Sequence, residues 1–367
     1  MTADPRQALS TGGYAPGTLR QQLWDAVTRR DEDAATTAAL TALDHGVDAE
    51  VMLLDVVAPV QRQVGTEWAA NRISVAQEHA ATSINDRVIA AVARHPVSRT
   101  EPRFGRVIVA CVDGEWHAMP ARLLAEVLRL RGWAVDFLGA QVPAPHLVAH
   151  IHQTGPDVVA LSSSIPTRLP IAHAVITACQ AAGAPVLVGG AAFGRDGRYA
   201  RLLGADAWAP DARAAGDQMA AGIERRRRSP STYEPVDDLP HLADEEHARV
   251  SRSASDLVKR TMTSLDEHFP AMRTYTEQQR QHTAEDIAHI VDFLATALYV
   301  DDDDLFTTFI TWTADILTAR GVPARSLHLG LDLLAGQLPD FPRANRILGA
   351  GRRRFDEHLA DSGPSPG

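Results

Sequence analysis

The chain has 367 residues, 45% of them hydrophobic, which is typical of two or three folded domains rather than of a disordered polypeptide. Its formal net charge of −10 argues against a broad nucleic-acid-binding surface, so we expect no direct contact with DNA or RNA. Cys111 and Cys179 lie in a predicted strand and a predicted helix, and we expect both to be inert core thiols. The sequence shows no signal-peptide pattern and no bilayer-spanning apolar run, which favours a soluble cytoplasmic protein without a membrane partner.

Composition and hydrophobic periodicity divide the chain into consecutive parts. We expect a disordered N-terminus, a four-helix cap bundle, an α/β domain, a linker and an all-helical domain, over residues 1–16, 17–95, 103–225, 226–240 and 241–360. In the bundle, Pro59 is expected to interrupt or kink the third helix. Ser74, followed three residues later by Gln77, predicts a capping box at the start of the fourth helix.

The α/β domain alternates short β-branched runs with helical patterns, which predicts a doubly wound parallel sheet. The expected strands cover 106–112, 133–138, 157–162, 185–188 and 205–208. The last domain shows only helical periodicity, punctuated by Gly and Pro. Its expected helices cover 245–266, 270–281, 284–299, 302–319, 324–337 and 344–360. The fold class is therefore multidomain, combining α and α/β domains.

A chemically rich loop follows the first expected strand, with the residues Asp113, Gly114, Glu115, Trp116, His117, Met119 and Pro120. Open parallel sheets bind ligands at the carboxyl ends of their strands, where this loop lies. His117 is therefore a candidate metal ligand or catalytic base, although its position alone favours an ordinary loop residue. Glu115 is a candidate partner for one imidazole nitrogen, an interaction that raises the donor strength of a ligating histidine.

Two later turns lie at the same expected edge of the sheet. Ser162, Ser163 and Ser164 follow the third strand, and Gly189 and Gly190 follow the fourth. Each turn has an ordinary explanation as the end of a strand. The serine hydroxyls can also donate hydrogen bonds to a heterocycle or a phosphate, and the glycines allow a ligand to approach the backbone closely.

Taken together, over about residues 104–222, these three motifs resemble the cobalamin-binding domain of methionine synthase, the mutases and their relatives. The resemblance implies that His117 ligates cobalt from below and that the tail of the cofactor lies near the serine and glycine turns. That family carries Asp and Gly where this chain has Glu115 and Pro120. The variant here is similar to the light-sensing cobalamin proteins rather than to the methyl carriers.

The cap bundle carries a second motif, in which Trp68 is followed by a turn containing Val75 and then by Glu78 and His79. This segment resembles the cap of the light-dependent cobalamin regulators. The resemblance implies that Trp68 and Val75 cover the upper face of the corrin, and that Glu78 and His79 contact the adenosyl group. The ordinary alternative is a core aromatic residue and a solvated helix face.

The chain departs from those regulators in two ways. Ala69 stands where they carry a histidine that can become a second axial ligand, so that photoproduct is not expected here. The cap bundle begins almost at once, and no winged-helix pattern precedes it. We therefore do not expect light-controlled release of DNA as the output.

The order of cap, cobalamin domain and helical domain resembles the photocobilins, in which a globin-like domain binds biliverdin beside adenosylcobalamin. No cysteine follows Cys179, so any bilin in the last domain is expected to be non-covalent. Arg320 and Arg325 flank a helix–helix turn and suit two propionates. Haem is the competing cofactor, with His289 or His328 as candidate axial ligands, although each alone is more typical of a core residue.

These observations predict a light sensor, rather than an enzyme, that binds adenosylcobalamin and biliverdin. Photolysis of the cobalt–carbon bond is expected to drive a change in homo-oligomeric state or in contact with a downstream signalling protein. One alternative is a corrinoid carrier for methyl transfer, which uses the same lower histidine. The other is a cobalamin-binding regulator without photochemistry.

Overall fold

The computed structural model describes residues 14–223, 239–322 and 325–361. The chain divides into two units, Met1–Arg228 and Ser229–Gly367. Most of the expected N-terminal segment 1–16 and of the expected linker 226–240 lies outside the described residues. Within the described part of the chain, no helix combines the length and the apolar composition needed to cross a bilayer.

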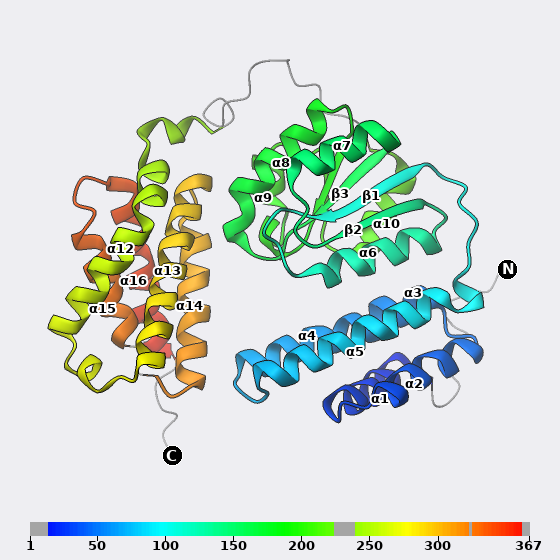
Figure 1. Cartoon of the computed structure of the whole chain (residues 1–367), viewed down its shortest axis with the longest axis horizontal. Helices are drawn as coiled ribbons and strands as arrows, with labels where there is room; N and C mark the ends of the chain where they lie inside the picture. Colours follow the sequence, from blue (N-terminus) through cyan, green and yellow to red (C-terminus); the bar gives the residue numbers. More distant parts are fainter. Residues whose placement is uncertain (1–13, 224–238, 323–324, 362–367) are drawn as a thin grey trace. The chain divides into compact units, whose positions relative to one another are not determined.

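The first unit begins with the expected helical bundle, coloured blue to cyan in Figure 1. Its helices are α1 Pro16–Thr28, α2 Glu32–Asp44, a third helix made of α3 Ala49–Val51, η2 Met52–Val57 and α4 Ala58–Ala69, and α5 Val75–Arg94. Leu23, Leu53 and Val88 belong to one buried core that the bundle helices share. The capping box at the start of α5 is confirmed: the Ser74 hydroxyl accepts from the Gln77 N–H at 3.2 Å, and the Ser74 N–H donates to the Gln77 side chain at 2.8 Å.

The third helix runs through Pro59 without a break, so the expected interruption was wrong. Proline lacks an N–H and its ring crowds the carbonyl four residues earlier. Here the turn before Pro59, Met52–Val57, is wound as a π-helix, and the Ala58 N–H donates to the Leu53 carbonyl five residues back. This wider turn accommodates the ring and lets the helix continue.

The five strands form one parallel sheet in the order β2-β1-β3-β4-β5, which confirms the doubly wound expectation. The strands are β1 Arg106–Cys111, β2 Ala134–Gly139, β3 Val158–Ser162, β4 Val186–Gly189 and β5 Ala207–Ala209. The helices between and after them are α6 Ala118–Leu130, α7 Ala144–Thr154, α8 Leu169–Ala181, α9 Arg198–Leu202 and α10 Ala212–Ala221 (Figure 1). Because right-handed crossovers leave β1 and β3 in opposite directions, the loops after these two neighbours meet at a topological switch point.

Helix α6 joins the sheet to the bundle. Its Ala121, Ala125 and Leu128 pack in the core beneath the sheet, against residues of β1 and α10. Its Leu123 belongs instead to the core of the bundle, and Met119 packs against that core. The helix that starts at the His117 loop therefore has one apolar face in each layer.

The second unit is helical, with η6 Pro240–Asp244, α12 Glu246–His268, η7 Pro270–Thr274, α13 Glu277–Val300, α14 Asp303–Ala319, α15 Arg325–Gly336 and α16 Pro342–Asp361. Residues 284–299 are helical as expected, but the expected helix over 270–281 and the break that follows it were wrong. Pro270 opens only a short 3₁₀ turn, and a capping box formed by Thr276 and Gln279 starts one helix that continues to Val300. A globin-like fold for this unit stays a prediction.

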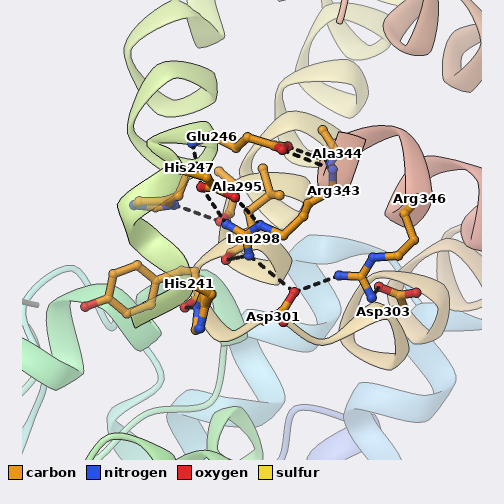
Figure 2. A network of polar contacts seen from close by, with 12 residues as sticks. His241, Glu246, His247, Ala295, Leu298, Asp301, Asp303, Arg343, Ala344 and Arg346 are labelled. Carbon is orange, nitrogen blue, oxygen red and sulfur yellow. Dashed lines mark hydrogen bonds and ion pairs between the residues drawn. The ribbon is translucent and has the colours of Figure 1, made fainter. Parts of the chain in front are cut away.

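A polar network holds the start of this second unit to its later helices, as Figure 2 shows. Glu246, at the first turn of α12, is buried and accepts from the backbone N–H groups of Arg343 and Ala344 at 3.1 and 2.8 Å. The Arg343 guanidinium donates to Asp244 at 3.0 Å and to the Leu298 carbonyl at 3.0 Å. The N-terminus of α16 is thus capped by a residue from the other end of the unit.

Candidate cobalamin site

The centre of the candidate site is a buried carboxylate, Glu115, on the loop after β1. It is 1% exposed. One oxygen accepts from the backbone N–H of His117 at 2.8 Å and from its Nδ1 at 2.6 Å. The other accepts from the N–H groups of Ser164 and Ile165 at 2.6 and 3.1 Å and from the Ser163 hydroxyl at 3.3 Å. The expected contact between Glu115 and the His117 imidazole is confirmed, and the same carboxylate ties the β1 loop to the β3 loop.

The hydrogen bonds decide the protonation of this pair. Burial alone would raise the pKa of Glu115, but the bonds from His117, Ser164 and Ile165 outweigh it and hold the pKa at about 2. The bond to Glu115 raises the pKa of His117 against the opposing effect of burial, and the charges of Glu115 and Glu78 add to the rise. Because a carboxylate only accepts, Nδ1 of His117 carries the hydrogen, and Nε2 of the neutral ring keeps its lone pair.

A cavity of about 110 Å³ lies beside the loop, between α6, α10 and the ends of the neighbouring strands. Pro120 and Leu124 line it from the α6 side, and Ser162, Gly189 and Gly190 line it from β3 and β4. The two turns singled out in the sequence are therefore brought together with Pro120.

The serine turn and the glycine turn make contacts that differ from those expected from the sequence. A Cβ on Gly190, whose φ is +101°, would lie 2.2 Å from the Ser163 carbonyl oxygen, so glycine is required there by the contact between the two loops. Ser163 is fully buried with its hydroxyl on Glu115, which corrects its expected role as a donor to the cofactor. Ser162 lines the cavity and its role as a donor stays a prediction, while Ser164 contributes its backbone N–H to Glu115.

The remaining loop residues surround His117 in distinct ways. Gly114 has φ +75°, and a Cβ there would lie 3.1 Å from the guanidinium of Arg168. The sequence analysis missed Arg168, for which only its place after the serine turn was a signal. Trp116 is 73% exposed, whereas Met119 packs against the core of the bundle. Asp113 is half-buried at the start of the turn.

The cap residues lie at the turn between α4 and α5. Trp68 is half-buried, and Val75 is 54% exposed, so neither is a core residue. Glu78 accepts from the Thr82 hydroxyl at 2.8 Å and pairs with Nδ1 of the exposed His79. The charge of Glu78 is the smallest of the contributions that raise the pKa of His117.

The donor set suits a metal whose other ligands come from a macrocycle. His117 offers a single imidazole nitrogen with a fixed tautomer, and its side chain is 57% exposed. Among the described residues, no group of three or more His, Cys, Asp or Glu side chains gathers as a metal cluster. Val75 in the cap and Trp116 in the loop are exposed and provide apolar surface. These residues fit a corrinoid that is ligated by one histidine and covered by apolar side chains.

The second unit holds a cavity of its own, of about 330 Å³, between α12, α13, α14 and α15. Arg320 lines it, together with Tyr275, His282 and Thr313. Both expected haem ligands lie outside the lining of this cavity. His289 is exposed on α13, and His328 pairs with Asp332 and Asp356. The side chain of Arg325 lies outside the described residues.

Comparison with known protein families agrees with this geometry. Residues 19–93 and residues 105–216 each match a B12 binding domain. The first unit is a cobalamin-binding module. The match to 105–216 contains Glu115, His117, the serine turn and the glycine turn, and the match to 19–93 contains Trp68, Glu78 and His79.

Individual relatives are each similar to part of the chain. It is 31% identical to the HTH-type transcriptional repressor CarA of Myxococcus xanthus over 180 residues, 47% of this chain and 58% of the repressor. It is 35% identical to the HTH-type transcriptional repressor CarH of the same organism over 144 residues, 38% of this chain and 46% of the repressor. It thus spans about half the length of these two relatives. Trimethylamine corrinoid protein 1 of Methanosarcina mazei is 23% identical over 194 residues, 51% of this chain and 89% of that protein.

Proposed function

We propose that the protein is a light sensor in which adenosylcobalamin is held between the cap bundle and the α/β domain. His117 would hold the cobalt, and Trp68 and Val75 would cover the cofactor from the side of the cap. Glu78 and His79 contact the adenosyl group. The protein acts as a sensor rather than as an enzyme, and its output is a change in oligomeric state or in contact with a partner protein.

The observation that carries the proposal is the Glu115 clamp. It orients the His117 ring, holds the proton on Nδ1 and leaves Nε2 for a metal, beside the cavity lined by Ser162 and Gly189. The likeness to the light-sensing cobalamin proteins rests on Glu115 and Pro120 in the loop and on Trp68, Glu78 and His79 in the cap. The identities with CarA and CarH, over 180 and 144 residues, support the same proposal.

In the proposed mechanism, bound adenosylcobalamin supplies a cobalt–carbon bond that light cleaves. The chain's own residues hold the two faces in place. Glu115 keeps the His117 ring from turning, while Glu78, which accepts from Thr82, would be an acceptor for hydrogen bonds from the upper ligand. The contacts of the cap would therefore depend on the state of the upper ligand, whereas the contact of Glu115 with His117 would not. The cap and the α/β domain then favour a different arrangement, because the two cofactor states bind the two conformations unequally.

Helix α6 is the proposed carrier of that change. It starts at His117, and its Met119 and Leu123 pack in the bundle while Ala121 and Ala125 pack beneath the sheet. The ion pairs of Arg131 with Glu50, at 2.8 Å, and of Arg213 with Asp55, at 2.9 Å, tie the same two layers away from the loop. If the cap moves, we therefore expect it to rotate about these ion pairs, which would stay in place.

The test is an absorption and size measurement on protein loaded with adenosylcobalamin in the dark. Green light is expected to change the cobalamin bands and to shift the elution volume in size-exclusion chromatography. A His117→Ala variant is expected to lose the ligated spectrum already in the dark. Unchanged bands and unchanged elution after illumination would contradict the sensor proposal.

The corrinoid methyl carrier is the second candidate, favoured by the likeness to trimethylamine corrinoid protein 1. The two candidates differ in the upper ligand. A carrier is expected to retain methylcobalamin at least as well as adenosylcobalamin and to pass its methyl group to a thiol in the presence of a methyltransferase. A regulator without photochemistry is expected to bind adenosylcobalamin and to keep one elution volume in dark and light.

For the second unit we propose non-covalent biliverdin as a further chromophore. Its support is the 330 Å³ cavity, in which Arg320 is a cationic partner for a propionate and His282 and Tyr275 add polar groups. His289 and His328 do not line this cavity, which argues against haem as the competing cofactor. A red-absorbing band that persists after desalting supports biliverdin, and a Soret band would support haem instead.

A further inference from the structure

A chain of hydrogen bonds runs through the cap behind Glu78. The Thr82 hydroxyl donates to Glu78 at 2.8 Å, and the Gln61 amide nitrogen donates to the Thr82 oxygen at 2.7 Å. The Asn85 amide nitrogen donates to the Gln61 carbonyl oxygen at 2.8 Å. Gln61 comes from α4 and the other three residues from α5, so the chain links the two helices that flank the cap turn.

The direction of this chain follows from donor and acceptor chemistry. A carboxylate only accepts, so the single hydroxyl hydrogen of Thr82 is committed to Glu78. Thr82 must then accept from Gln61, which orients the Gln61 amide and places its carbonyl toward Asn85. Each amide orientation is fixed by the one before it. All donors therefore point toward Glu78, and one oxygen of that carboxylate is held in a single place.

The buried end of this hydrogen-bond chain, at Asn85, lowers the stability of the fold. Asn85 is fully buried in the bundle, and its amide oxygen finds no hydrogen-bond partner in the part of the chain that the structure describes. A buried polar group left unpaired destabilises a fold, and an apolar side chain at this position would avoid that cost. The network ends at Glu78, whose charge reaches the ring of His117.

We propose that Thr82, Gln61 and Asn85 are positioning residues that fix the Glu78 carboxylate as an acceptor for hydroxyl groups on the upper ligand of cobalt. This inference rests on the proposed function. Its consequence is ligand selection: an adenosyl group carries ribose hydroxyls that can donate to Glu78, whereas a methyl group carries none. The chain thus favours adenosylcobalamin over methylcobalamin without any of its three members touching the cofactor.

The experiment compares dissociation constants for adenosylcobalamin and methylcobalamin, measured in the dark on the full chain. Thr82→Val removes the hydroxyl and keeps the side-chain shape, and it is expected to weaken adenosylcobalamin binding about tenfold with methylcobalamin unchanged. Thr82→Ser restores the donor and is expected to recover the wild-type preference. Gln61→Met breaks the next link and is expected to cost about threefold. Ser83→Ala, an exposed neighbour on α5, is the control and is expected to leave both affinities unchanged.

The outcomes separate this inference from the function on which it rests. Equal losses for both cobalamins in Thr82→Val would overturn the positioning role and leave the light-sensor proposal intact. Equal binding of both cobalamins by the wild type would also overturn it. A wild type that binds neither cobalamin would overturn both proposals. Melting temperatures of the ligand-free variants show whether the cap still folds, since a purely structural role lowers stability without altering the ratio of affinities.

Discussion

Glu115 in the first unit and Glu246 in the second are buried carboxylates built into the fold in the same way. Their exposed fractions are 1% and 4%. Each accepts two backbone N–H groups from a distant segment: Ser164 and Ile165 donate to Glu115, and Arg343 and Ala344 donate to Glu246 (Figure 2). In both places a carboxylate replaces the missing partners of a loop or a helix start.

The difference lies in what else the carboxylate holds. Glu115 also accepts from the imidazole of His117, whose side chain remains 57% exposed. Beside Glu246, the Arg343 side chain is only 16% exposed and its guanidinium is engaged with Asp244, Asp301 and a carbonyl. Of these two buried carboxylates, only Glu115 orients an exposed donor, and this difference is the reason that we place the proposed ligand site beside it.

The largest effect is expected from Glu246→Ala. It leaves the N–H groups of Arg343 and Ala344 without an acceptor inside the protein and should lower the free energy of unfolding of the second unit by about 3 kcal/mol. Chemical denaturation with hydrogen exchange of the α16 amides measures this change. Glu246→Gln keeps an acceptor and should cost less. Cobalamin affinity should not change in either variant, and a loss of affinity would contradict the purely structural role.

The second largest effect is expected from His117→Ala. Cobalamin affinity should fall by about a hundredfold, because the metal loses its protein ligand. Titration followed by absorption in the dark measures the affinity. The unfolding free energy should change little, since the imidazole is 57% exposed. His152→Ala removes an exposed histidine of α7, outside the proposed site, and should leave the ligated spectrum intact. An unaltered spectrum in His117→Ala would remove this residue from the site.

Glu115→Gln should weaken cobalamin binding between about tenfold and a hundredfold, because the orienting carboxylate becomes a neutral amide. Isothermal titration on dark samples measures this loss. Glu126→Gln is a matched control: Glu126 is also buried, at 4% exposure, but it pairs with Arg122 and Arg129 on α6. The control should lower stability and leave affinity unchanged. Equal affinity losses in both variants would mean that Glu115 supports only the fold.

The smallest expected effect is the dependence on pH of the stability of the second unit. Burial lowers the pKa of His247 below its ordinary value of 6.5, and the charges of Arg343 and His241 add to the fall, against the hydrogen bond to the Ala295 carbonyl. A lowered histidine pKa means that the folded state binds fewer protons, so stability is present above pH 6.5 and is lost as the pH falls through the folded value.

Asp244 is expected to cause a second loss of stability of this unit at acid pH. Burial opposes its ionisation, but hydrogen bonds from Arg343 and the Glu246 N–H lower its pKa below the ordinary value of 3.8. Stability from this group is present above pH 3.8 and is lost below it. Hydrogen exchange of α12 and α16 between pH 7 and pH 3 follows both steps. His247→Gln should abolish the first step alone, and persistence of that step would assign it to another group.

Local patterns were enough to predict much of the first unit. The β-branched runs predicted five parallel strands, and the spacing of Ser74 and Gln77 predicted the capping box. The contact of Glu115 with His117 was predicted because the two residues lie two positions apart on one loop. The π-helical turn before Pro59 was not, because the helix adapts its winding to the proline only within the packed bundle.

Longer-range contacts escaped prediction. Ser163 was expected to serve a cofactor, but the fold directs its hydroxyl to Glu115. His328 was a candidate ligand, but packing of α15 against α16 turns it toward Asp332 and Asp356. The Glu246 network joins residues almost a hundred positions apart, and no local pattern signals it.

The sequence by itself determined the order of the layers, the loop that carries His117 and the B12-binding character of the first unit, because these depend on periodicity and on short motifs. Only the tertiary structure decided which nitrogen of His117 faces outward, which serine lines the cavity and how Glu78 is held. Those choices depend on hydrogen bonds between segments that the fold alone brings together, and a buried carboxylate takes whichever donors the packing places around it.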